Sequence, residues 1–241
     1  MPVILRTLLL LLMLTPWLQA SAEEKPAATD TSTVVLKPFV AYYKGSANGF
    51  SIGNLGTREL TPLGDNRYRL EYKASALIYS LEETSVFSVV NGEIRPESYR
   101  SVRGTVFNRS KDTLDFDWQH MTVSALHKGE RRQYKLIPGT QDPLSASMTL
   151  ALLLSKSSPT LQYPEAGKRD VETDKLVLVD QPDLKTPMGD ISTWHLKRIH
   201  DNPKRHTEIW IDKQYPAIPV KVHQTDDGDE FLLNLVKIKF K

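Results

Sequence analysis

The chain has 241 residues, with 31 basic and 29 acidic side chains, a formal net charge of +2 and no cysteine. A charge so close to neutral argues against a dedicated nucleic-acid binder or a polybasic membrane patch. Without cysteine there is no disulfide and no lipid-accepting thiol, so stability must come from a hydrophobic core.

The first residues are typical of a secretory signal peptide. Arg6 precedes the apolar run of residues 7–14, and Pro16 interrupts that run. Ala20 and Ala22 place small residues at both specificity positions of a cleavage site. The run is also too short to remain as a membrane-spanning helix. We therefore expect export, with cleavage after Ala22.

This interpretation divides the chain into three parts. Residues 1–22 are expected to be the signal peptide, and residues 23–33, which lack large apolar side chains, a flexible leader. Residues 34–241 are expected to form a single β-barrel-like domain. The mature chain is then expected to be periplasmic, without a transmembrane segment, and not a lipoprotein.

Alternating apolar and polar residues predict strands along most of the domain. Residues 67–76 alternate most clearly, with aromatic and aliphatic side chains on one face and charged ones on the other. That pattern is typical of a half-buried antiparallel strand, and residues 49–63 are its predicted hairpin partner. The same reasoning predicts strands at residues 84–90, 113–118, 121–126, 131–137, 175–179, 191–199, 206–211, 219–224 and 231–240.

Residues 142–154, DPLSASMTLALLL, predict a helix instead. Asp142 suits a helix cap and Pro143 suits the first turn. A helix that is apolar on nearly all sides is buried or covers an apolar surface. We therefore predict a mainly β fold, a curled antiparallel sheet (barrel or half-barrel) of roughly 11–13 strands. One short buried helix at about 142–155 fills its concave side.

Two clusters of metal-binding residue types have simpler explanations. His195, His200 and His206 straddle a turn and are interleaved with four basic residues, which disfavour a cation. Asp115 and Asp117 share one face of a strand but supply too few ligands for calcium. We interpret them as solvated hairpin histidines and a solvated acidic face, and predict no metal site and no cofactor.

Catalysis by serine finds little support in the sequence. Ser145 lies near a helix start, but no G-x-S-x-G motif surrounds it and no histidine lies nearby along the chain. Its hydroxyl can satisfy a free helical N–H instead. We predict no catalytic residue and rank a hydrolase last.

Aromatic residues of the first third of the domain are candidates for a ligand site. Together with the apolar helix they can line a groove for an acyl chain or another apolar ligand. The alternative for each of them is an ordinary place in the core. The candidate groove-lining residues are Tyr43, Phe50, Tyr68, Leu70, Tyr72, Leu144, Met148 and Leu152.

Six motifs follow one another along the domain: PFVAYYKGSANGFSIGN, YRLEYKASA, NGEIRPESY, the helix DPLSASMTLALLL, TPMGDISTWHLKR and EIWIDKQYPAIPVKVHQ. Their order over residues 36–239 resembles the domain of unknown function 3108 family of Gram-negative envelope proteins. The resemblance implies export and a mostly antiparallel β architecture, without an established reaction. A curled sheet with a helix as filler is also similar, at the level of fold only, to LolA-like and LolB-like lipoprotein carriers.

Three functions remain open at this point. The first is a non-enzymatic periplasmic binding or carrier protein with an apolar groove for a lipid-like ligand. The second is an interaction or regulatory module that binds another envelope protein and has no small-molecule ligand. The third is the hydrolase.

Overall fold

The structure, a computed structural model, describes residues 36–51, 56–76, 78–158 and 160–241. The expected signal peptide, its cleavage site and the leader lie outside these residues. The chain divides into two units, and every described residue belongs to the second, Ser32–Lys241.

The described residues form sixteen strands and one helix. None of their helices is long and apolar enough to cross a membrane. The elements are β1 (Phe39–Ala47), β2 (Phe50–Ser51), β3 (Gly56–Gly64), β4 (Arg67–Ala76), β5 (Tyr79–Val90), β6 (Glu93–Thr105), β7 (Arg109–Asp117), β8 (Thr122–His127), β9 (Glu130–Lys135), α1 (Ala146–Ser155), β10 (Leu161–Ala166), β11 (Val171–Asp180), β12 (Asp183–Thr186), β13 (Gly189–Arg198), β14 (Arg205–Asp212), β15 (Pro219–Asp226) and β16 (Asp229–Phe240).

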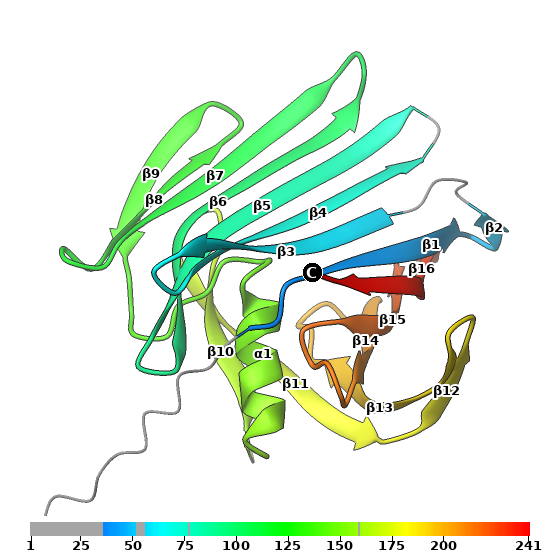
Figure 1. Ribbon diagram of the computed structural model, residues 1–241. Helices are drawn as coiled ribbons and strands as arrows, with labels where there is room; N and C mark the ends of the chain where they lie inside the picture. The colour runs from blue at the N-terminus through cyan, green and yellow to red at the C-terminus, as the bar shows by residue number, and fades with distance from the viewer. Residues whose placement is uncertain (1–35, 52–55, 77, 159) are drawn as a thin grey trace, which may run out of the picture. The chain divides into compact units, whose positions relative to one another are not determined.

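All the strands belong to one antiparallel sheet. Its main path runs β10-β11-β13-β14-β15-β16-β1-β3-β4-β5-β6-β7-β8-β9, and β2 and β12 pair beside it. The sheet curls around α1 (Figure 1), so that the helix lies on its concave side. The predicted curled antiparallel sheet with one short helix is thereby confirmed, with more strands than the predicted number.

The two edges of the sheet approach each other without closing a ladder. Tyr134 of edge strand β9 donates its hydroxyl proton to the carbonyl of Gly167, just after edge strand β10. Gln141, on the segment that leads to α1, makes an isolated parallel bridge with Glu165 of β10. The segment between β9 and α1 therefore covers an edge that would otherwise leave backbone groups unpaired.

The core forms two clusters of buried side chains, and α1 contributes to both. Leu144 and Met148 join the cluster that is built by β1, β3–β8, β10, β15 and β16. Ala146, Leu150 and Leu154 join the cluster on β10, β11, β13 and β14. Because its two sides pack against two parts of the curled sheet, the helix needs apolar residues on nearly all sides.

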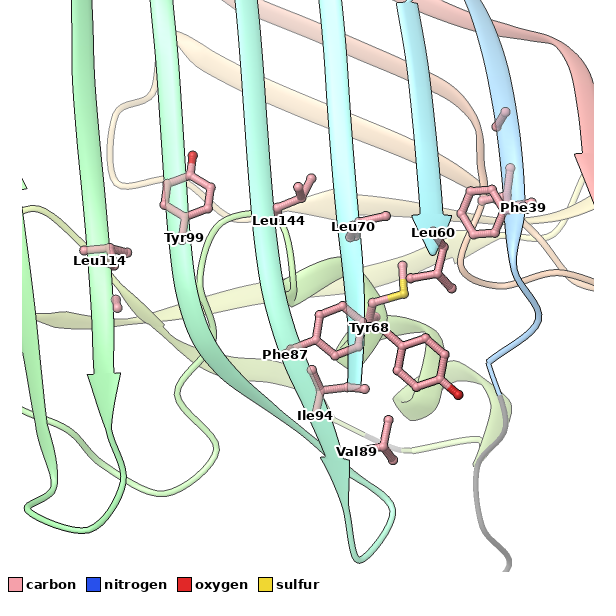
Figure 2. Packing of buried hydrophobic residues seen from close by; sticks show 14 of the residues in the cluster. Phe39, Leu60, Tyr68, Leu70, Phe87, Val89, Ile94, Tyr99, Leu114 and Leu144 are labelled. Carbon is pink, nitrogen blue, oxygen red and sulfur yellow. The ribbon is translucent and has the colours of Figure 1, made fainter. Parts of the chain in front are cut away.

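Figure 2 shows the first cluster from close by. Tyr68 and Phe87 stack with their ring centroids 5.8 Å apart, and Ile94 lies beside them. Leu144, from the turn before the helix, lies between Leu70 and Tyr99 in the same view. Strand alternation therefore produces a packed layer between sheet and helix over this part of the curl.

Candidate functional site

Buried polar side chains hold the turn that precedes α1. Asp142 Oδ1 accepts hydrogen bonds from the backbone N–H groups of Leu144 and Ser145, both at 2.8 Å. Its Oδ2 accepts one from Ser85 Oγ of β5 at 2.6 Å. Ser145 Oγ donates to Gln141 Oε1 at 3.1 Å. The prediction of Asp142 as the helix cap is wrong: α1 begins at Ala146 with Ser145 at its N-cap, and the Asp142 carboxylate instead holds the turn before the helix.

The Asp142 carboxyl lies wholly inside the protein. Burial disfavours its charged form and raises its pKa to about 6, although its hydrogen bonds oppose that shift. The helix start therefore holds a carboxyl group whose charge changes near neutral pH.

Two shallow grooves flank the exposed side of α1. The first, which we call the Tyr215 groove, has a volume of about 230 Å³ and is lined by Leu36, Lys37, Phe39, Ala151, Leu152, Ser155, Gln214, Tyr215, Pro216, Ala217, Ile218 and Phe240. The second, the Gln141 groove, has about 270 Å³ and is lined by Gly92, Glu93, Ile94, Gly139, Gln141, Thr149, Leu152, Leu153, Lys156, Gln162, Tyr163 and Pro164. Leu152 lines both grooves.

The Tyr215 groove has an apolar floor and one cation at its rim. The Tyr215 and Phe240 rings lie 4.4 Å apart between centroids. Lys37 Nζ lies 4.0 Å from the centroid of Phe240 and 5.5 Å from that of Tyr215, a cation–π arrangement. Such a surface favours contact with an apolar chain.

The predicted site residues are distributed over the packed core, the grooves and the rim of the sheet. Leu152 lines both grooves, Tyr72 is half-buried and Phe50 is 78% exposed. The remaining five lie in the packed core between sheet and helix: Tyr43, Tyr68, Leu70, Leu144 and Met148.

Phe50 belongs to a rim of exposed apolar side chains at neighbouring strand ends. Ile78 and Tyr79 lie at the turn between β4 and β5, where they are 63% and 47% exposed. Val106 and Phe107 lie at the turn between β6 and β7, where they are 66% and 91% exposed. Phe50 is therefore separate from the grooves beside α1.

Sequence reasoning missed most of the Tyr215 groove. Phe39 begins β1, Phe240 ends β16, and Tyr215 lies in the loop between β14 and β15. These residues come together because β1 pairs with β16 at Phe39 and Phe240. The sequence QYPAIP was a partial indication of this groove, because it places a tyrosine and apolar residues next to prolines.

The histidines do not all match their prediction as solvated hairpin residues. His195 is 9% exposed, and its ring stacks on Trp210 with centroids 4.2 Å apart, so the prediction is wrong for this residue. Its Nδ1 lies 2.9 Å from an Asp180 oxygen. His200 Nε2 lies 2.9 Å from Thr207 Oγ1. Within the described ranges, no group of three or more histidines and acidic residues has the geometry of a metal site.

A second polar cluster lies on β10, β11 and β13, beside a groove of about 320 Å³. Asp174 accepts hydrogen bonds from Tyr163 Oη at 2.8 Å and from Arg198 Nε at 2.7 Å. Burial raises the pKa of neighbouring Glu165 to about 7, although Arg198 opposes the shift. Because these charges compensate one another within the protein, the cluster is explained as a stabilising network.

Comparisons with solved structures identify the fold. The beta-barrel-like protein of domain of unknown function DUF1849 from Brucella abortus is 13% identical, with a TM-score of 0.58. The match covers 86% of this chain and 99% of that protein. A DUF1329 family protein from Desulfovibrio piger is 9% identical over 88% of both chains, but its TM-score of 0.24 carries no argument.

Comparison with family models identifies the family. No curated protein matches the chain. The model described as "Protein of unknown function (DUF3108)" matches residues 39–235, which is most of the chain and nearly the whole described sheet. The chain belongs to the DUF3108 family.

Proposed function

We propose that the mature chain is a non-enzymatic carrier or binding protein of the periplasm, which takes a lipid-like ligand into the grooves beside α1. The observation that carries this proposal is the position of Leu152, a half-buried apolar side chain that lines both grooves. The β-barrel-like fold of the related structure and the expected signal peptide support it.

The size of the grooves limits what they take. Ligand sites commonly have volumes of about 300 Å³ or more, so each groove suits part of an acyl chain rather than a bulky ring system. Burial of about 200 Å² of apolar ligand surface contributes roughly 5 kcal/mol at 25 cal/mol per Å². Such affinity suits a carrier, which must also release what it binds.

Replacing Leu152 by aspartate is expected to abolish uptake of an apolar ligand while the protein stays folded. The new carboxylate lies at a half-exposed position, where water still reaches it, but it faces both grooves. We expect at least a tenfold loss of affinity for a fluorescent fatty acid, measured by titration of the mature protein.

Val177→Asp is the matched control. Val177 is a β11 side chain 45% exposed and outside both grooves, so this variant introduces the same charge without affecting uptake. Unchanged affinity in a folded Leu152→Asp protein would contradict the proposed site.

A further inference from the structure

Two neighbouring cross-strand rows on the concave face differ in chemistry. One row runs through Phe39, Leu60, Leu70, Ser85, Tyr99, Leu114 and Ala125, and it packs largely as core. The next runs through Ala41, Arg58, Tyr72, Glu83, Ser101, Asp112 and His127. Since paired residues share a face of the sheet, a polar row borders the packed core.

Arg58 is the unusual member of the polar row. It is 6% exposed, and its Nη2 donates a hydrogen bond to Ser147 Oγ of α1. Its Nε has no hydrogen-bond partner, and none of the ion pairs among the described residues includes it. Burying a guanidinium without a carboxylate partner is costly, so the fold retains a cation that it does not neutralise directly.

Two tyrosines lie close enough to this cation to influence its pKa. Tyr43 is 1% exposed, and its buried hydroxyl also has no hydrogen-bond partner. Tyr72 pairs directly with Arg58 across β3 and β4. Gly56 lies beside both residues: a Cβ on it would lie 3.7 Å from both the Tyr72 hydroxyl and the Tyr43 Cβ.

The nearest negative charge has another partner. Glu83 faces Tyr72 across β4 and β5 and raises the pKa of Arg58, opposing the effect of burial. Its carboxylate, however, accepts a hydrogen bond from the Tyr99 hydroxyl. Glu83 therefore provides long-range compensation, and the unpaired N–H of Arg58 and O–H of Tyr43 remain as donors for an oxygen ligand.

We propose that Arg58, Tyr43 and Tyr72 form an oxyanion site, which binds the carboxylate or phosphate group of an apolar ligand. A guanidinium and phenolic hydroxyls are donors that suit either oxyanion, and a buried position strengthens such hydrogen bonds. The inference rests on the proposed function for the apolar part of the ligand. It also gives two predicted site residues, Tyr43 and Tyr72, a role in recognising the head group.

The test compares ligands that share one chain and differ in the head group. Dodecanoate, dodecyl phosphate and dodecanol are titrated into the mature protein at pH 7, with inorganic phosphate alone as a fourth probe. We expect at least one of the two acids to bind about tenfold or more tightly than the alcohol, the ratio expected for hydrogen bonds to a charged group.

Two substitutions assign that preference to the site. Arg58→Met replaces a buried charge by an apolar side chain, and Tyr43→Phe removes only an unpartnered oxygen. Both should bring the affinity for the acid down to that for the alcohol, while Tyr68→Phe, elsewhere on the same face, should not. If Arg58→Met does not fold, the affinities measured for Tyr43→Phe alone test whether the preference for the acid arises at this site.

The outcomes separate this inference from the proposed function. Equal binding of the acids and the alcohol by the unmodified protein would overturn the oxyanion site and leave the carrier function standing. Binding of inorganic phosphate alone, lost in Tyr43→Phe, would support the oxyanion site and contradict the carrier function. Binding of none of the four probes would overturn both.

Discussion

Replacing Met148 by aspartate is expected to unfold the protein at 25 °C. Met148 has no exposed surface and packs in the cluster between α1 and the concave sheet. An unpaired carboxylate there loses its hydration and leaves the side chains around it poorly packed. We expect a loss of at least about 4 kcal/mol, a large part of the stability of a typical domain.

Met148→Leu is the control for this prediction. A similar volume without charge is expected to cost less than about 1.5 kcal/mol. Urea unfolding followed by circular dichroism measures both variants. If Met148→Asp stayed folded with a similar midpoint, α1 would not be the packed filler of the curl, and the grooves beside it would lose their fixed wall.

Replacing Asp142 by asparagine is expected to remove the change in unfolding free energy that the Asp142 carboxyl causes between pH 4 and pH 7. The pKa of Asp142 is about 6 in the folded protein, against about 3.9 in an unfolded chain. The folded state therefore binds the proton more tightly. This tighter proton binding stabilises the folded protein by roughly 3 kcal/mol below about pH 4. The stabilisation is lost as the pH rises through 6.

Asparagine preserves the structural role of this residue. Its side-chain oxygen can still accept from the N–H groups of Leu144 and Ser145, and the Ser85 hydroxyl can turn to accept from its amide. Glu165, whose pKa is raised chiefly by burial, keeps that effect in the variant and loses only the smaller contribution from the charge of Asp142. The difference between the unfolding free energies of the two proteins at several pH values therefore reports Asp142 together with its smaller effect on Glu165, and parallel curves would contradict the assignment of Asp142 as a buried titrating group.

The sequence anticipated the parts of the fold that depend on local pattern. β4 matches residues 67–76 of the prediction because its alternation is uninterrupted. The β5–β6 hairpin turns at Asn91 and Gly92, whose φ angles of 52° and 75° need the residue types found there. The buried helix was predictable because apolar residues on all its sides have no other stable location.

Other elements could not be predicted because long-range pairing forms them. β10 contains Pro164, which disfavours an interior strand but is tolerated at the edge that this strand occupies. β12 has four residues and exists through its pairing with β13. The α-helix starts at Ala146 rather than near Asp142, since the preceding residues form a turn around the buried carboxylate.

The candidate site also combines residues that a local pattern predicts with residues that long-range pairing brings together. Leu152 was predictable from its place on an apolar helix, but alternation alone cannot distinguish a strand residue in the core from one beside a groove. That distinction depends on where the curled sheet and α1 meet. The Tyr215 groove is beyond sequence reasoning because it joins the first and last strands of the described sheet.

The most direct test of the carrier function is native mass spectrometry of the mature protein purified from a Gram-negative periplasm. Spectra of the unmodified protein and of Leu152→Asp are compared, and bound material is identified after solvent extraction. The proposed function predicts a co-purifying lipid-like mass on the unmodified protein that is absent from the variant. A bare protein mass in repeated preparations, with no lipid in the extract, would contradict it.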